Sequence, residues 1–407
     1  DHAADPHPHE GRTVKLVYIA NIHVPTEKAH GLQIFQNAEA LADAGASVEL
    51  WAARRTNTPE MRAIADPFAH YGVKKNFRLI LLPTLDLLPL VPGRSDKLAQ
   101  IIFGIQWLTF TLMAALRVIF TRPDVIYTRD SLIAVMCGVF ARRVGYEPHT
   151  ISTGRIGRTL QNWASKRAAA IFPVTRKLAD DLIAQGAVRE KITVVPDGVR
   201  AARFADVPDQ AAARARIGWG ADRFVVGYLG RLHTMNMEKG VGTLIDALLQ
   251  VPGASIALVG GPDEMANAFR ADWIKRGGDP DGFLYAGQVA PDDVPRYLAA
   301  FDVCAMPLPF TPHFAYYASP LKLFEYMAAR RAILATDLPS FREILTDGET
   351  ALLTPPSDAA ALAEAIRRLQ ADPPLRARLA ENAYARVMSD FTWAARARVI
   401  VGRLTTT

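Results

Sequence analysis

Short apolar runs rich in β-branched residues alternate with helical patterns along the chain of 407 residues. The first strand-like run covers residues 14–20, a helical pattern follows over 31–44 until Gly45, and the next run covers 48–52. A strand, a helix and a strand separated by glycine are typical of a parallel α/β sheet. Further strands are expected at 77–82, 124–128, just before Glu147, and 170–174.

A second series of strands and helices follows residues 200–222, an Ala- and Arg-rich stretch without a strand pattern. Its strands are expected at 224–229, 256–259, 283–286 and 303–306. The length of the chain also exceeds what one ordinary hydrophobic core supports. The sequence therefore predicts two Rossmann-like, doubly wound parallel-sheet domains of the α/β class.

The pattern also sets provisional boundaries. Residues 1–12 have no apolar segment and are expected to be a disordered tail. We place an N-terminal domain at 13–205, including an apolar region at 83–117, and a C-terminal domain at 206–390. Residues 391–407 have the pattern of an amphipathic helix, which we expect to pack back toward the N-terminal domain.

Residues 98–116 form a run of nineteen residues without a charge, which is long enough to span a membrane. The run contains Gln100 and Gln106 and lies between two strand-like segments, which favours a buried or interfacial helix. Together with the Pro-punctuated apolar loop before it, the run suggests a surface patch for lipid or for a lipid-linked acceptor.

The net charge of +6 and the pI near 9.3 favour an anionic partner. No Lys/Arg run with interleaved aromatic residues is present, so nucleic acid is not the expected partner. The two cysteines, Cys137 and Cys304, lie in apolar segments and are expected to be buried thiols in a reducing compartment.

The most informative stretch is SPLKLFEYMAARRAILAT, residues 319–336, which predicts a helix followed by a strand. Ser319 is a suitable N-cap and Pro320 suits the first helical position. Leu321, Phe324 and Ala328 then form an apolar stripe at helical spacing, which packs the helix onto a sheet.

On another side of this helix Lys322 and Glu325 lie one turn apart. The free N–H groups of a helix start attract a phosphate, and the carboxylate of Glu325 can accept hydrogen bonds from both hydroxyls of a ribose. This arrangement describes a nucleotide site. The alternative is a surface helix on which Lys322 and Glu325 form an ordinary ion pair.

A second cationic motif follows the first strand of the second domain. Gly230 and Arg231 end that strand, and Lys239 and Gly240 precede the next helix. The rigid fork of an arginine and the point charge of a lysine near a helix start are what a diphosphate requires.

These motifs resemble family-4 retaining glycosyltransferases of the GT-B fold. The resemblance lies in GR…EKG, the LVGG run at Leu258, AGQV and SPLKLFEYMA, and it covers nearly the whole chain. The first domain also contains segments that look like landmarks of the same family. They are PTEKAHGLQ, DVIYTRD, the Glu-Pro-His of residues 147–149 and VVPDGV. The resemblance implies two domains that face a central cleft.

The resemblance also implies roles for individual residues. Arg231 and Lys239 would bind the donor diphosphate, with His149 orienting the donor or assisting the acceptor proton, and these three form the expected catalytic set. The expected donor-nucleotide contacts are Gly31, Gly230, Gly287, Gln288, Val289, Ser319, Pro320, Leu321, Lys322 and Glu325. No metal and no cofactor are expected, because the cations supply the charge that the leaving diphosphate needs.

Four positions depart from the family pattern. Tyr317 stands where the first glutamate of a Glu-x7-Glu pair is usual, in the donor-sugar region. Arg330 and Ala332 replace a usual Gly and Pro, and Asp197 replaces a common Asn. The nucleotide contacts are therefore better supported by the sequence than the sugar contacts.

The function that the resemblance implies is transfer of a sugar from a nucleoside-diphosphate sugar to a glycan or lipid-linked acceptor, with retention and without a metal. The alternatives are a nucleotide-sugar-binding protein without transfer activity and a sugar-nucleotide epimerase. An altered sugar formed without any acceptor would favour the epimerase, and binding without transfer or hydrolysis would favour the binding protein. The expected location is the cytoplasm, with peripheral contact at the inner face of an anionic membrane as a hypothesis.

Overall fold

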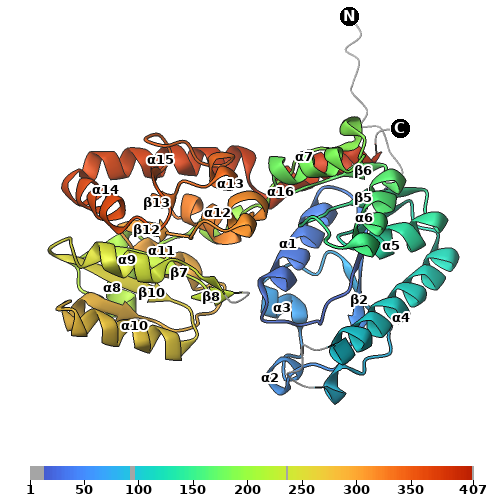
Figure 1. Cartoon of the computed structure of the whole chain (residues 1–407), viewed down its shortest axis with the longest axis horizontal. Helices are drawn as coiled ribbons and strands as arrows, with labels where there is room; N and C mark the ends of the chain where they lie inside the picture. The colour runs from blue at the N-terminus through green and yellow to red at the C-terminus, as the bar shows by residue number, and fades with distance from the viewer. Residues whose placement is uncertain (1–12, 92–96, 235–236, 406–407) are drawn as a thin grey trace, which may run out of the picture.

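The computed structural model describes residues 13–91, 97–234 and 237–405. The residues predicted to form a tail, 1–12, lie outside the described part of the chain. Figure 1 shows two α/β domains side by side. Val14 and Leu404, near the two ends of the described chain, line one surface pocket of the first domain.

The first domain has a parallel six-stranded sheet in the order β3-β2-β1-β4-β5-β6. This is the order of a doubly wound dinucleotide-binding fold. Its strands are β1 Lys15–Ala20, β2 Ser47–Arg54, β3 Arg78–Pro83, β4 Val125–Thr128, β5 Arg143–Tyr146 and β6 Ala170–Ile171. The last strand is shorter than the predicted run at 170–174.

The second domain repeats this topology in a parallel sheet with the order β11-β10-β7-β12-β13-β14. Its strands are β7 Phe224–Leu229, β10 Ala254–Val259, β11 Phe283–Tyr285, β12 Val303–Met306, β13 Ala332–Thr336 and β14 Leu352–Thr354. The predicted class of two Rossmann-like domains is confirmed. The edge strand β14 and a hairpin of β8 His233–Thr234 and β9 Met237–Glu238 were not predicted, because their strands are only two or three residues long.

The helices connect successive strands and cover both faces of each sheet (Figure 1). Those of the first domain are α1 Ala29–Asp43, α2 Pro59–Arg62, α3 Pro67–Tyr71, α4 Lys97–Thr121, α5 Ser131–Met136, α6 Arg155–Arg167 and α7 Arg176–Ala184. Those that follow are α8 Gln210–Ile217, α9 Val241–Leu248, α10 Asp263–Lys275, α11 Val294–Ala300, α12 Leu321–Ala328, α13 Pro339–Arg342, α14 Ala359–Ala371, α15 Pro373–Asp390 and α16 Trp393–Thr405. The short helical turns are η1 Leu88–Leu90, η2 Cys137–Phe140, η3 Arg189–Lys191, η4 Ala201–Phe204, η5 Pro280–Gly282 and η6 His313–Tyr317, the last of them a π-helix.

The alternation of side chains along β1 divides the core of the first domain into two layers. Leu16 and Tyr18 pack with α1 and α16, whereas Val17 and Ile19 pack with α4 and α5 on the other face. Both faces of the sheet are therefore covered, as a parallel sheet requires. The cysteines of η2 and β12 are buried and unpaired, which confirms the expectation of buried thiols.

α4 is, by length and composition, the one described helix that could cross a membrane, although core helices meet the same criteria. One face of α4 packs on the sheet through Phe110, Ala114 and Val118. Gln106 on this face exchanges hydrogen bonds with Asn21 at 2.9 and 3.1 Å. The opposite face is rich in exposed apolar side chains. α4 is thus buried on one face, as expected of a buried or interfacial helix, and its contact with a membrane stays a prediction.

The two domains are joined by two chain segments that cross side by side. The N–H of Val199 donates to the carbonyl of Phe391 at 2.8 Å, and the N–H of Trp393 donates to the carbonyl of Val199 at 3.1 Å. A Cβ at Gly198 would lie 2.8 to 2.9 Å from backbone atoms of the second segment. Beyond this crossing, α16 packs against α1 of the first domain (Figure 1).

Candidate active site

The start of α12 lies against the first domain. The helix begins at Leu321, with Pro320 at the N-cap position and no side-chain cap. The predicted cap by Ser319 is wrong, because its hydroxyl instead accepts a hydrogen bond of 2.9 Å from the N–H of Asp197. Leu321, predicted to pack the helix onto a sheet, contacts the hydrophobic core of the first domain. The motif thus helps to hold the two domains together.

Lys322 extends from α12 to the end of β7. Its Nζ donates a hydrogen bond of 2.9 Å to the hydroxyl of Tyr228, which in turn donates to the carbonyl of Arg231 at 2.8 Å. A Cβ at Gly230, which has a φ of +125°, would lie 2.4 Å from Nζ of Lys322. Gly230 therefore leaves the space in which the ammonium group of Lys322 lies.

Lys322 and Glu325 are half-buried, so the alternative of an ordinary surface helix is wrong. Burial, together with the like charge of Lys239, lowers the pKa of Lys322 to about 7. Burial raises the pKa of Glu325, against the opposing charges of Arg203 and Lys322. The site therefore holds ionisable groups whose charged forms lack full compensation, as is common at functional sites.

Lys239 approaches the same region from the loop before α9. Its Nζ lies 4.0 Å from the centre of the Phe314 ring, and burial lowers its pKa to about 8. Gly240 after it has a φ of +81°, and a Cβ there would lie 1.6 Å from the carbonyl oxygen of Pro307. The glycine is required for this close approach of the loop to the end of β12.

Arg231, which the sequence predicts to bind the diphosphate together with Lys239, is placed differently from that lysine. Its side chain is exposed and makes no hydrogen bond or ion pair with a residue in the described part of the chain. Gly230 and Arg231 nevertheless follow β7 directly, and β7 adjoins β12, where the strand order reverses. Ligands of open α/β sheets bind at this position.

The segment predicted to contact the nucleobase follows β11. Gly287 has a φ of +61° and its carbonyl accepts a hydrogen bond of 2.6 Å from the N–H of Gly260. Val289 packs against the core of the second domain, while Gln288 is exposed. These residues lie at the carboxyl ends of β10 and β11, at the same edge of the sheet as Gly230.

The predicted contribution of Gly31 is not supported by the structure. Gly31 lies inside α1, and its N–H already donates to the carbonyl of Lys28 at 3.0 Å. A Cβ at Gly31 would lie 2.5 Å from the Thr26 side chain and 2.6 Å from the Tyr71 hydroxyl. Packing therefore explains this glycine without a bound phosphate.

Tyr317 points toward the first domain. Its hydroxyl donates a hydrogen bond of 2.7 Å to Asp181 of α7, and the preceding carbonyl, of Tyr316, accepts from the hydroxyl of Thr175 at 2.7 Å. The residue that replaces the usual glutamate therefore links the two domains. No metal-binding group of three or more His, Cys, Asp or Glu side chains occurs among the residues that the structure describes.

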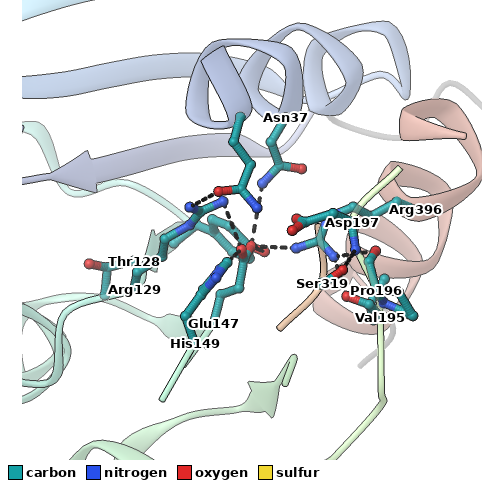
Figure 2. Close-up of polar contacts among 12 residues, drawn as sticks. Asn37, Thr128, Arg129, Glu147, His149, Val195, Pro196, Asp197, Ser319 and Arg396 are labelled. Carbon is teal, nitrogen blue, oxygen red and sulfur yellow. Dashed lines mark hydrogen bonds and ion pairs between the residues drawn. The ribbon is translucent and has the colours of Figure 1, made fainter. Parts of the chain in front are cut away.

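In the first domain His149 belongs to a buried charged cluster centred on Glu147, at the end of β5 (Figure 2). Nε2 of His149 lies 2.7 Å from Oε1 of Glu147. Arg129 lies 2.9 Å from the same oxygen, and Arg396 of α16 lies 2.7 Å from Oε2. Burial opposes the charge of Glu147, but the two guanidinium groups outweigh it and hold the pKa of the carboxyl well below its usual range.

Sequence reasoning identified His149 but missed Arg129, Arg396 and the central role of Glu147. A signal was present for Arg396, which shares the apolar face of its helix with Trp393, Ala397 and Ile400 at helical spacing. A charged residue at a predicted core position indicates a buried partner.

Two family matches agree with the two domains. Residues 31–198 match the family described as "Glycosyl transferase 4-like domain", and residues 223–372 match "Glycosyl transferases group 1". Together the matches cover well over half of the chain. The fold is of the GT-B type, and the chain belongs to the glycosyltransferases that combine these two domains.

Curated relatives resemble part of the chain. It is 32% identical over 199 residues to a phosphatidyl-myo-inositol mannosyltransferase of Mycolicibacterium smegmatis, covering 47% of this chain and 46% of the relative. It is also 32% identical over 220 residues to a D-inositol 3-phosphate glycosyltransferase of Acidothermus cellulolyticus, covering 51% and 46%. The chain thus spans about half the length of these curated relatives.

Solved structures resemble nearly the whole chain. A sucrose-phosphate synthase from Thermosynechococcus elongatus is 22% identical with a TM-score of 0.74, over 96% of this chain and 98% of that one. The Anabaena protein HepE, solved with UDP-glucose, is 20% identical with a TM-score of 0.67, over 97% and 100%. At these identities the likeness establishes the fold.

Proposed function

We propose that the protein transfers a sugar from a nucleoside-diphosphate sugar to a glycan or lipid-linked acceptor. The observation that carries this proposal is the convergence of Lys239, Lys322 and Glu325 at the strand-order reversal of the second sheet. Two partly buried ammonium groups suit a diphosphate, and the carboxylate one turn into α12 suits a ribose. The family membership and the naming of curated relatives as glycosyltransferases support the same conclusion.

Departure of a nucleoside diphosphate leaves anionic charge on the phosphates and positive character on the sugar. The ammonium groups of Lys239 and Lys322 would stabilise this leaving group, so no metal is required in the proposed reaction. Arg231 would add a third charge if its exposed side chain turned toward the phosphates. Retention of configuration would follow from attack on the face that the diphosphate leaves, with His149 orienting the donor or assisting the acceptor proton.

The donor site is tested by thermal unfolding with UDP-, GDP- and ADP-linked sugars, because a ligand at a hundred times its Kd adds about 2.7 kcal/mol of stability. We expect one base class to raise the Tm, and Glu325→Ala and Lys239→Ala each to abolish this rise and to lower transfer by orders of magnitude. The matched controls Glu264→Ala and Lys275→Ala change exposed residues of α10 and should leave the rise in Tm and the rate of transfer unchanged.

Two results would contradict this proposal. Transfer at the wild-type rate in Glu325→Ala or Lys239→Ala would remove these residues from the site. Stabilisation by a sugar nucleotide without transfer to any glycan or lipid acceptor would identify a binding protein.

The acceptor side is proposed from the outer surface of the first domain. The exposed apolar side chains of α4 there, named the α4 face, are Leu98, Ile101, Phe103, Ile105, Leu108, Leu112, Leu116, Ile119 and Phe120. The 3-10 turn η2 packs against α4 and adds exposed Val139 and Phe140. Val139 shares a surface pocket of about 390 Å³ with Trp163 and Lys166 of α6.

Lys166 and Arg167, at the end of α6, line the same pocket as Val139 and add positive charge to this side of the domain. Apolar side chains flanked by cations suit the surface of an anionic bilayer. We therefore propose that the protein contacts the inner face of a membrane that holds its acceptor, from a cytoplasmic location.

Membrane contact is measured by sedimentation with phosphatidylglycerol and phosphatidylcholine vesicles at low salt. We expect binding to the anionic vesicles and its loss when Ile101 and Leu112 are both changed to Glu. Ile274→Glu is the control, because Ile274 is 43% exposed on α10 of the other domain. Equal binding by the double variant and the wild type would exclude the α4 face as the contact surface.

A further inference from the structure

The buried cluster around Glu147 joins three parts of the chain that are distant in sequence. Glu147 follows β5, Arg129 follows β4, and Arg396 belongs to the last helix (Figure 2). Glu147 is completely buried, whereas the His149 side chain is 29% exposed. The histidine is therefore the member of the pair that a ligand can reach.

Both oxygens of Glu147 act as hydrogen-bond acceptors. In addition to the ion pairs with the two guanidinium groups, Oε2 accepts a hydrogen bond from the hydroxyl of Tyr127 and one of 3.4 Å from the side-chain amide of Asn37. Burial and the charge of Glu147 raise the pKa of Tyr127 well above its usual value, so its hydroxyl keeps its proton. An anionic carboxylate has no proton to donate.

The contact between Glu147 and His149 therefore has a defined direction. Nε2 of His149 must carry the hydrogen in the 2.7 Å contact, because Oε1 can only accept. In the neutral imidazole this leaves Nδ1 as an acceptor. No hydrogen bond joins Nδ1 to another residue of the described chain, so it is available to a substrate hydroxyl.

Arg396 connects this carboxylate to the border between the domains. Its Nη1 donates to the carbonyls of Val195 and of Pro196, the latter at 2.9 Å, while Nη2 lies 2.7 Å from Glu147. The next residue, Asp197, donates its N–H to Ser319 beside α12. The guanidinium group of Arg396 thus binds both the carboxylate of Glu147 and the loop of residues 195–197 that contacts Ser319 before α12.

From this geometry we propose that Glu147 is a positioning residue that fixes the Nε2–H tautomer and ring orientation of His149. Arg396 holds Glu147 in place, which makes the C-terminal helix a part of the site in the first domain. This inference rests on the proposed transferase function only for its effect on activity. The tautomer itself is a property of the protein alone.

The first test is the 15N NMR spectrum of the wild-type full chain labelled at histidine, with His149→Gln used to assign the signal. We expect the neutral ring of His149 to be in the Nε2–H tautomer. In Glu147→Gln and Arg396→Lys we expect a mixture of tautomers, since a lysine cannot form the same fork. A predominant Nδ1–H form in the wild type overturns the proposal, and that result requires no folded variant.

The second test is a double-mutant cycle on transfer. We expect Glu147→Gln to lower kcat roughly tenfold or more, with a smaller effect on the KM of the donor. In the His149→Gln background the same change should lower kcat less than about threefold, because coupled residues are non-additive. Equal losses in both backgrounds would overturn the positioning role.

Arg398→Lys is the matched control for Arg396→Lys, because Arg398 lies on the exposed side of the same helix. It should leave the His149 spectrum and transfer unchanged. Donor stabilisation in the thermal assay is measured on every variant. Failure of that assay in the wild type would contradict the proposed function, whereas a wrong tautomer would contradict the positioning role alone.

Discussion

The two lysines of the proposed donor site predict that binding of a sugar nucleotide takes up protons. Burial lowers the pKa of Lys322 to about 7 and that of Lys239 to about 8. A bound diphosphate favours the charged forms and raises both values again. Affinity should therefore be greatest below about pH 7 and decrease as the pH rises through the two pKa values of the free protein.

The size of the effect follows from the fraction of each lysine that is neutral before binding. At pH 7 about half of Lys322 and about a tenth of Lys239 are neutral, which gives an uptake of about 0.6 proton per donor bound. At pH 8 the uptake rises to about 1.4 protons. Burial, together with the charge of Lys239, lowers the pKa of His313 nearby.

Isothermal titration calorimetry in buffers of different ionisation enthalpy measures this uptake directly. The sugar nucleotide is used because a free nucleoside diphosphate has a terminal phosphate that titrates near pH 6. In Lys322→Met the uptake at pH 8 should fall to about 0.5 proton, from Lys239 alone. The control Lys275→Met changes an exposed lysine and should behave as the wild type.

An uptake that stays near zero between pH 7 and pH 8 would refute this reasoning. It would mean that the ammonium groups are already fully charged in the free protein, or that they do not contact the phosphates. The Lys322→Met variant distinguishes the two cases. It loses affinity for the sugar nucleotide only if the ammonium groups contact the phosphates and are already charged in the free protein.

Two further predictions concern the contacts between the domains. Tyr317→Phe removes the hydrogen bond to Asp181 and should lower the free energy of unfolding by about 1 kcal/mol. The rate of transfer should be unchanged, and a large loss of kcat would instead place Tyr317 at the substrate. Gly198→Ala places a Cβ against backbone atoms and should cost about 1–3 kcal/mol, seen as a lower Tm. Gly242→Ala on α9, where no atom lies within 4 Å of the added Cβ, is its control, and equal Tm values for the two variants would contradict the argument.

The sequence determined the elements whose signals are local. Alternating apolar runs and helical patterns predicted most of the strands, and the apolar stripe of residues 321–328 predicted the helix that carries Lys322 and Glu325. These predictions succeed because periodicity reflects which side of an element is buried. Strands of two or three residues, such as β14, are too short to show a period.

Tertiary structure decided which side chains meet. The partner of Ser319 is Asp197 of the opposite domain, and the hydroxyl of Tyr317 reaches Asp181 of α7. The Glu147 cluster requires Arg396, which the chain supplies only after crossing the second domain and returning. Local propensity contains no information about such pairs, because burial and charge pairing arise only when distant segments pack.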